Sequence, residues 1–588
     1  MLFLTQILLV LLAITVTATS QSYDYIVVGG GTSGLVLANR LSEDPGVSVL
    51  VVEAGSSVLN NVNVTDPNRY SMAFDTKLDW AYESVNQSFG GGPQVLRAGR
   101  ALGGSSAING MAYVRAQDVQ VDAWEAIGND GWTWETLFPY YLKSENFTIP
   151  AQTQVDAGAT FESAEHGFQG PLRTAFPPMN ATGELTPLIN ETLHALGIPW
   201  NRDINGGRMR GFSIYPWTLD GEIRHDAARA YYWPFANRAN LHVLLDTRVN
   251  RILWAQPSNT TTDELTASGV EISLANTTSH IVAKKEVILS AGVLRSPALL
   301  ELSGVGNPRI LEAYGIPVMI DLPTVGENLQ DQMNTLMTAS GENIVTGGRT
   351  VTFATAQDIF GTTTASVAAA LYAQLPAYAH QMATASHDAM PAEALLRLFH
   401  VQHDLIFKQN VPVAEIIFKP AGSDTTTINA GYWGLLPYAR GSVHIASASP
   451  AANPSINPNY GLLPWDVQLQ NAIARFIRSV FNTDPLRSFI KEETLPGLAA
   501  VPGNASDSVW TDWLKHNYAS NFHPVGTTAM LPRSMGGVVN PHMKVYGTAN
   551  VRVVDNSIHP FQLCGHPVSN LYAIAERAAD LIKGDMKG

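Results

Sequence analysis

The first regular pattern of hydrophobic and polar positions begins near Tyr25. A short apolar run, Tyr25 to Val28, predicts a buried strand, and an apolar pattern with helical spacing follows from about Ser33 to Leu41. A second apolar run, Ser48 to Val52, predicts another strand, which ends in Glu53. Strand, glycine turn, helix and strand in this order are typical of a βαβ unit that binds a dinucleotide. We therefore expect an α/β fold with a Rossmann-like domain.

Three glycines with the spacing Gly29-x-Gly31-x-x-Gly34 lie where the first strand meets the helix. Gly29 permits a tight turn, Gly31 lets the backbone approach a pyrophosphate, and Gly34 allows the helix to pack on the strand. The helix N-terminus adds partial positive charge beside the phosphates. Glu53, nineteen residues after Gly34, is expected to accept hydrogen bonds from a ribose.

The glycine motif alone does not separate a nicotinamide from a flavin, and two later segments bear on this. Arg97 to Asp122 contains a loop of glycine, serine and other small residues that is too long for an ordinary turn, as expected where backbone folds around a large cofactor. Lys284 to Gly306 predicts a buried strand, a glycine turn and a helix that opens at Ser296-Pro297. Each segment alone is compatible with a structural loop.

Composition and charge narrow the class of protein. The 588 residues are 45% hydrophobic and 15% charged, which describes a globular chain large enough for two or three cores. With 36 basic and 50 acidic residues the net charge is −14, so nucleic acid and anionic membranes are not expected partners. Cys564 is the only cysteine, which excludes an intrachain disulfide, and it is given no catalytic role. His400, His403 and Asp404 lack a clear fourth ligand, so no metal site is predicted.

The N-terminus and the asparagine triplets indicate secretion. Residues 1–20 form an apolar run that ends in small residues, with Ala18 or Ser20 as cleavage positions, although no basic side chain precedes it. Eight Asn-x-Ser/Thr triplets without proline are candidate N-glycan sites. They begin at Asn63, Asn86, Asn146, Asn180, Asn190, Asn259, Asn276 and Asn504. We expect an extracellular protein that carries glycans at several of these positions.

Two histidines near the C-terminus each precede a proline among small residues. His523 lies in "SNFHPVGT" and His566 in "CGHPVSN". A titratable ring beside a conformationally fixed residue suits general acid–base chemistry. Taken alone, however, a pair of histidines is also compatible with ordinary structural hydrogen bonding.

Several segments together resemble the glucose-methanol-choline (GMC) oxidoreductases. Gly99 to Asn109, with Tyr113 and other residues downstream, is similar to the first signature of that family, and Gly292 to Gly306 is similar to the second. Val325 to Gln332 and Val551 to Pro560 resemble two further family segments. The resemblance runs from about Tyr23 to the end of the chain, with the motifs in the order and spacing of the family.

The resemblance implies FAD as the cofactor. It also implies that the residues contacting FAD are Gly29, Gly31, Thr32, Ser33, Gly34, Glu53, Arg100, Gly103, Ser105, Asn109, Gly110, Met111, Ala112, Val249 and Asp555. Family members with covalently attached flavin usually have a histidine in or beside the first signature. Gly99 to Arg115 contains none, and Ile108 occupies one such position. We therefore expect noncovalent FAD.

The same resemblance assigns roles at the substrate end. It implies oxidation of an alcohol, in which His523 takes the hydroxyl proton, His566 assists it and hydride passes to flavin N5. Within the family the chain resembles fungal glucose dehydrogenases and then glucose oxidases, and Tyr70, Glu415 and Asn521 match their glucose-binding residues.

One departure puts glucose in doubt. The glucose-binding arginine of those relatives is Ala519 here, although Arg97 or a loop arginine could replace it. A bulkier alcohol, such as a glycoside or a specialised metabolite, is the alternative substrate. A redox-silent lyase or cyclase with the same fold and a nicotinamide-dependent dehydrogenase are the rival functions. The acceptor of electrons is expected to be quinone-like or oxygen, and a dehydrogenase is preferred over an oxidase.

The motifs divide the chain into interleaved domains. The FAD-binding domain is expected to comprise residues 22–120, 240–335 and 545–588, and an α+β substrate-binding domain residues 121–239 and 336–544. We expect the two domains to meet at the flavin.

Overall fold

The computed structural model describes residues 21–179, 185–256, 264–275, 277–341, 347–421 and 424–585. The predicted signal peptide, residues 1–20, lies outside these ranges, as do the triplet asparagines Asn180, Asn259 and Asn276. Within the described ranges, no helix combines the length and the apolar character that crossing a membrane requires.

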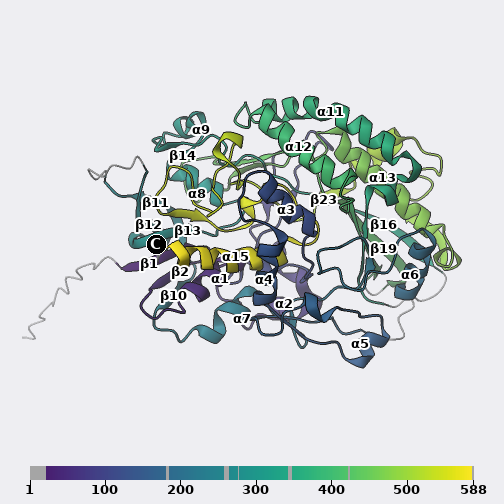
Figure 1. Ribbon diagram of the computed structural model, residues 1–588, viewed down its shortest axis with the longest axis horizontal. Helices are drawn as coiled ribbons and strands as arrows, with labels where there is room; N and C mark the ends of the chain where they lie inside the picture. The colour runs from purple at the N-terminus through teal and green to yellow at the C-terminus, as the bar shows by residue number, and fades with distance from the viewer. Residues whose placement is uncertain are drawn as a thin grey trace, which may run out of the picture.

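A seven-stranded mixed sheet forms the half of the molecule that contains the glycine turn (Figure 1). Its strands follow the order β10-β2-β1-β13-β12-β11, and β24 also pairs with β13. β10, β2, β1, the end of β13 and β24 run parallel, while β12 is antiparallel to its neighbours β13 and β11. The bounds are β1 Ser22–Val28, β2 Val49–Val52, β10 Leu241–Leu244, β11 Arg248–Trp254, β12 Ala267–Leu274, β13 Thr277–Leu289 and β24 Val551–Val553.

Helices from both ends of the chain pack together beside this sheet. α1 (Thr32–Leu41) follows β1 and lies against α15 (Pro567–Asp585), the last helix, which also packs on α4 (Trp134–Ser144). Figure 1 shows α1 and α15 side by side, next to the strands. The fully buried residues of α1 include Leu37 and Val36, which join the core formed with the apolar residues of β1 and β2. The βαβ unit predicted near the N-terminus is therefore present, with element ends within a few residues of the expected ones.

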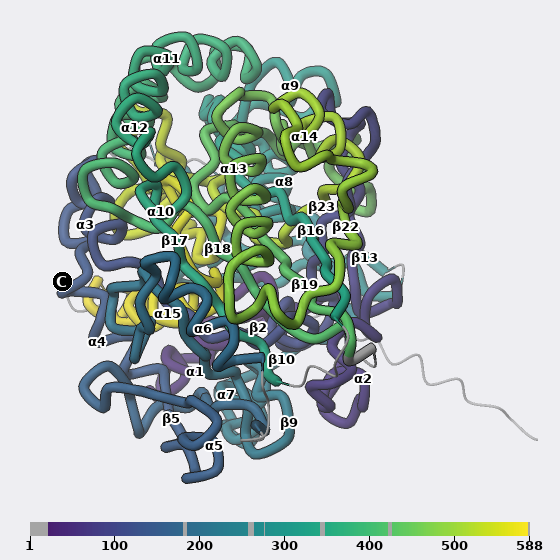
Figure 2. Tube along the Cα trace, turned by 90° about the vertical axis from the view of Figure 1, so that its right-hand side faces the viewer, coloured from purple at the N-terminus to yellow at the C-terminus, as the bar shows by residue number. Residues whose placement is uncertain are grey.

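A second seven-stranded sheet, antiparallel throughout, forms the other half. Its order is β22-β16-β19-β18-β17-β7, and β23 pairs with β16. The bounds are β7 Gly211–Ser213, β16 Met333–Gly341, β17 Thr350–Ala354, β18 Ala414–Ala421, β19 Asp424–Gly434, β22 Ile490–Leu495 and β23 Tyr518–Ser520. α13 (Pro464–Phe481) packs on β19 and β16, and α11 (Thr364–Ala385) pairs with α12 (Ala392–Phe407) at the top of the molecule in Figure 2.

The two sheets do not separate at the expected domain boundary. β16 begins at Met333, two residues before the expected end of the FAD-binding segment 240–335, yet it belongs wholly to the second sheet. The segment 121–239 also contributes α4, which packs on α15 of the first half. The two halves are thus closely interleaved, and the domain boundaries stay predictions.

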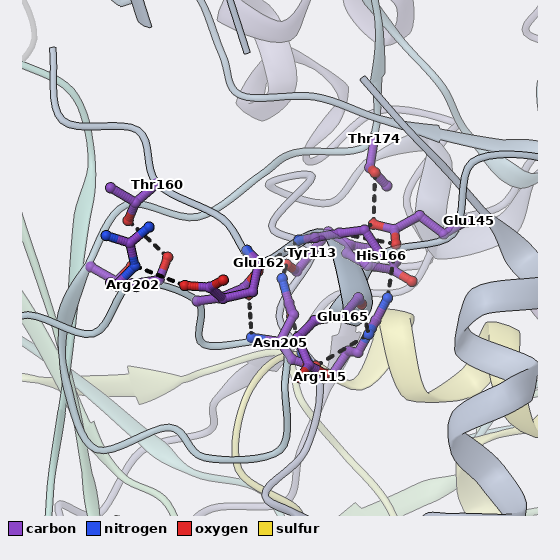
Figure 3. A network of polar contacts seen from close by, with 12 residues as sticks. Tyr113, Arg115, Glu145, Thr160, Glu162, Glu165, His166, Thr174, Arg202 and Asn205 are labelled. Carbon is purple, nitrogen blue, oxygen red and sulfur yellow. Dashed lines mark hydrogen bonds and ion pairs between the residues drawn. The ribbon is translucent and has the colours of Figure 1, made fainter. Parts of the chain in front are cut away.

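A buried network of charges surrounds Arg115, Glu145 and His166 (Figure 3). Arg115 donates to Glu145 at 2.8 Å, and neither side chain is exposed to solvent. His166 lies between two carboxylates, with Nδ1 at 3.1 Å from Glu145 and Nε2 at 2.9 Å from Asp203. Burial opposes the charged forms, but the hydrogen bonds to Asp203 and Glu145 raise the pKa of His166 to about 9. Burial likewise opposes ionisation of Glu145, but Arg115, His166 and the Gly167 amide lower its pKa below the ordinary value.

This network lies next to Val114, whose backbone supports the candidate site. The backbone amide of Arg115 donates to Asn205 at 2.9 Å, which fixes the chain next to Val114. The carbonyl of Val114 in turn accepts from the amide of His566 at 3.1 Å and from the hydroxyl of Ser569 at 2.5 Å. The buried charges therefore help to hold the backbone on which His566 rests.

Candidate functional site

A cavity of about 420 Å³ extends from the glycine turn to the two histidines. Both halves of the molecule contribute to its walls. Of the residues expected at the site, those that line it are Gly29, Gly31, Thr32, Ser33, Tyr70, Ser105, Asn109, Gly110, Met111, Ala112, Asn521, His523, Asp555 and His566. Those that do not are Gly34, Glu53, Arg100, Gly103, Val249 and Glu415.

The start of α1 forms one end of the cavity. The helix is preceded by Gly31, which has no side chain to cap the first amides, and its first turn contains no acidic residue. Unpaired amides at a helix start favour a bound anion. Gly34 is required for a different reason, since a Cβ there would stand 2.0 Å from the carbonyl oxygen of Gly29. Gly34 therefore allows α1 to pack closely against the turn, although it does not line the cavity.

Gly104 brings the first-signature loop against the glycine turn. Its φ is +54°, and a Cβ at this position would lie 2.6 Å from the Cα of Gly31. The two backbones therefore make a close cradle at the phosphate-binding end. A cradle of amides without side chains is what the pyrophosphate of FAD requires, so the residues present fit that group.

Glu53 lies beneath the glycine turn. One carboxylate oxygen accepts from the amide of Gly30 at 2.8 Å and the other from the amide of Gly55 at 2.7 Å. Burial raises the pKa of Glu53 to about 7, although these amides oppose the rise. In this structure Glu53 braces the turn, and its expected contact with a ribose stays a prediction.

Asp555, which lines the cavity, connects the second signature to the C-terminal segment. One oxygen accepts from the amide of Gly292 at 2.9 Å and from the hydroxyl of Ser296 at 2.6 Å, while the other accepts from the amide of Ser557 at 2.8 Å. Burial raises the pKa of Asp555 despite these bonds. The carboxylate therefore fixes the second signature, at the start of α8 (Ser296–Leu302), beside the C-terminal segment.

His523 follows β23 and faces the far end of the cavity. Its Nδ1 lies 3.0 Å from Oε1 of Gln332 and 2.9 Å from Nδ2 of Asn521. When Nδ1 carries the proton and donates to Gln332, the lone pair is on Nε2, for which the described residues provide no hydrogen-bond partner. Burial and the neighbouring His566 lower the pKa of His523 well below its ordinary value of 6.5. The ring is therefore neutral at pH 7 and able to accept a proton.

His566 immediately precedes the first residue of α15. Its ring centroid is 5.0 Å from that of His523, at an interplanar angle of 80°, so both rings can contact one small group. Nε2 lies 2.9 Å from Oε1 of Glu415, which is fully buried in β18. The contact with this carboxylate fixes the orientation of the His566 ring. Glu415 therefore lies behind His566, and its expected contact with substrate stays a prediction.

Several residues of the site were not anticipated. Asp331 accepts from the amide of His523 at 3.0 Å, and Trp433, paired with Glu415 across β19 and β18, contacts both histidine rings edge-on at 6.3 Å. Gln332 belongs to a family segment recognised in the sequence, yet nothing local indicates that it meets His523. These contacts join strands far apart in the chain, which no motif spacing reveals.

The residues expected to bind substrate have different surroundings. Asn521 is held by Asn334, which donates to it at 2.8 Å and also lines the cavity. Ala519 lies opposite Asn334 in the pairing of β23 with β16, and it is solvent-exposed and outside the cavity lining. Tyr70 lines the cavity with Arg349, whose guanidinium is 5.1 Å from the tyrosine ring centroid. A loop arginine thus reaches the cavity from the segment before β17, whereas Ala519 lies in β23.

Comparisons with known proteins identify the family of the chain. The family models described as GMC oxidoreductase match residues 23–334 and 437–575. A glucose oxidase-like protein, fsoC, of Humicola fuscoatra is 43% identical, with 96% of each chain covered. An FAD-dependent oxidoreductase structure from Chaetomium thermophilum has a TM-score of 0.84 at 30% identity, covering 96% of this chain and all of the other. A fungal aryl-alcohol oxidase structure has a TM-score of 0.85 at 28% identity, covering 96% of this chain and 99% of the other.

Both family models, the near full-length relative and the two structures point to the same class of flavoprotein, and FAD is the cofactor that they imply. The chain belongs to the GMC oxidoreductase family.

Proposed function

We propose that this protein oxidises the hydroxyl group of an alcohol, with His523 as the general base and His566 as its partner. The observation that carries the proposal is the pair of rings 5.0 Å apart at one end of the cavity, with His523 neutral and its Nε2 unpartnered among the described residues. When bound, FAD supplies the acceptor for the hydride that leaves the carbinol carbon. The protein must therefore orient the alcohol, exclude water and take the hydroxyl proton.

Each histidine has a distinct part in that step. His523 takes the hydroxyl proton on Nε2, while Nδ1 keeps its own proton and donates it as a hydrogen bond to Oε1 of Gln332. His566 is oriented by Glu415, and its position 5.0 Å from the base allows it to help hold the hydroxyl group beside His523. Loss of one proton to His523 and of one hydride to the cofactor converts the alcohol to a carbonyl compound.

The flavin is proposed to bind noncovalently. Ile108, which occupies a position where some relatives have the histidine that attaches the flavin, is buried and lines the cavity. Precipitation of the purified protein with acid should leave the yellow colour in the supernatant. Colour that stays with the washed pellet would contradict noncovalent binding.

Anaerobic mixing with alcohols tests the function. We expect one or more of glucose, xylose, aryl β-glucosides and benzylic alcohols to bleach the flavin, because only an oxidoreductase transfers hydride from them. A flavin that stays yellow with every alcohol, while the protein transforms substrate without net oxidation, would support the redox-silent rival. A purified protein without a yellow chromophore would contradict the proposal.

The electron acceptor and the location are also proposals. Resemblance to glucose dehydrogenases favours a quinone-like acceptor, so the reduced flavin should reoxidise faster with a quinone than with oxygen. Secretion is supported by the apolar segment 1–20 and by the asparagine triplets. Among the described triplets, Asn86 and Asn504 are exposed, and Asn63, Asn146 and Asn190 are partly exposed. Exposed asparagines are accessible to glycan transfer.

A further inference from the structure

Three arginines line the cavity, and their guanidinium groups have different partners. Arg97 pairs with Asp75 and Asp79, each at 2.6 Å. Arg295 donates to two backbone carbonyls, at 2.8 and 2.7 Å. Arg349 forms no ion pair with any carboxylate in the described part of the chain. It therefore brings an uncompensated positive charge to the cavity wall.

Aromatic rings hold Arg349 close to the histidine pair. Its guanidinium lies 5.1 Å from the ring centroid of Tyr70 and 4.9 Å from that of Trp217. It is also near Tyr215, where it opposes the rise in the phenol pKa that burial causes. Tyr215 stacks on His566, with centroids 6.3 Å apart at 24°. One tyrosine ring thus stands between the guanidinium and the proposed catalytic pair.

A second cation lies behind Arg349. In the antiparallel pairing of β17 with β18, Thr350 faces Phe418 and Val351 faces Ile417, so the next position of the register places Arg349 opposite Lys419. Lys419 shares its strand face with Ile417, which lines the cavity. Burial and then the charge of Arg349 lower the pKa of Lys419. Lys419 likewise forms no ion pair with a described carboxylate.

Two facing cations without a counter-charge repel each other, and their partial burial strengthens the repulsion. Faces of aromatic rings weaken that repulsion only in part, and sugar hydroxyls carry no charge that would cancel it. A carboxylate does cancel it, and its two oxygens match the fork of a guanidinium. The chemistry of this wall therefore selects an anion over a neutral polyol.

We propose that the cavity takes alcohols that also carry a carboxylate, which Arg349 binds directly while Lys419 adds positive charge behind it. The inference rests on the proposed alcohol oxidation and specifies its substrate class. The hydroxyl would face His523 and His566, and the carboxylate would lie beyond Tyr215. Ala519 is consistent with this change of specificity, because the arginine that binds glucose in relatives is absent.

Matched substrates test the inference. We would measure anaerobic flavin reduction of the full-length holoenzyme at pH 7 with 4-(hydroxymethyl)benzoate and with the corresponding neutral amide. The carboxylate should be preferred by about 10- to 100-fold in the second-order rate constant, the range of a charged hydrogen-bonded pair. In Arg349→Met this preference should fall to about one, and Arg349→Lys should keep part of it. The control Lys408→Met, on an exposed helix end, should retain the full preference.

Equal rates for the two substrates in the wild type would overturn the inference, as would an unchanged preference in Arg349→Met. Benzoate binding gives a second readout that needs no turnover, measured as a shift of the melting temperature. Benzoate should bind about tenfold more weakly to Arg349→Met than to the wild type. Equal binding would count against the anion site. If benzoate binding depends on Arg349 but no alcohol bleaches the flavin, the anion site stands and the proposed oxidation fails.

Discussion

Replacement of His523 by asparagine should slow flavin reduction by an alcohol about 100- to 10,000-fold, which is the usual contribution of a general base. Asparagine retains a polar group toward Gln332 but has no nitrogen that accepts a proton at Nε2. The flavin should still be bound, because its phosphate cradle lies at the opposite end of the cavity. Stopped-flow absorbance of the reduction step, with flavin content measured on the same sample, checks both expectations.

A control and a pH profile sharpen this test. His516→Asn, at an exposed position seven residues earlier, should reduce at the wild-type rate. Because the pKa of His523 lies well below 6.5, the wild-type rate should fall only at a pH clearly below that value. Loss of a general base should slow the reaction at least about 100-fold. A His523→Asn variant that is slowed by less than about threefold would therefore contradict the proposed role of His523.

Replacement of Glu145 by leucine should lower the free energy of unfolding by about 3–5 kcal/mol, since it leaves the buried charge of Arg115 without its partner. His166 loses one of its two carboxylates in the same variant. Thermal and denaturant unfolding of the holoprotein measure the effect. Glu162→Gln is a suitable control, because Glu162 pairs with Arg202 at the exposed surface and such pairs contribute less than about 1 kcal/mol.

The pH dependence of the free energy of unfolding shows whether the network acts through its charges or only through packing of its side chains. The folded pKa of His166 is raised to about 9, so its contribution is fully present below pH 6.5 and is lost as the pH rises through 9. In Glu145→Leu this alkaline loss should shrink, although His444, which pairs with Glu301 and Glu327, retains a loss of the same sign. Identical alkaline slopes in wild type and variant would contradict the charged state of His166.

Local patterns predicted the nucleotide end well because its determinants are local. The strand ending at Val28, the glycine turn and the helix to Leu41 are neighbours in sequence, and the turn is fixed by steric limits such as the 2.0 Å approach at Gly34. The same patterns left the hydrogen bonds of Glu53 unresolved. Its distance from Gly34 suits a ribose ligand, yet in the fold both oxygens also brace backbone amides.

The substrate end was less predictable because its contacts cross the second sheet. His523 and His566 were recognisable from the resemblance to the family. Their partners are distant in the chain: Gln332 immediately precedes β16, and Glu415 lies in β18. Arg349 belongs to no recognised sequence motif. Its proposed role in binding a carboxylate follows only from the fold, in which it lines the cavity and no described carboxylate pairs with it. A sequence does not show which charges lack a partner, because pairing depends on strands distant in the chain.

The central claim is that this GMC oxidoreductase removes a proton and a hydride from an alcohol. Anaerobic titration of the holoenzyme with 4-(hydroxymethyl)benzoate, followed by product analysis, tests that claim most directly. We predict bleaching of the flavin with one equivalent of 4-formylbenzoate formed per flavin reduced. A flavin that remains oxidised with this and every other alcohol, at every pH where the protein is folded, would contradict it.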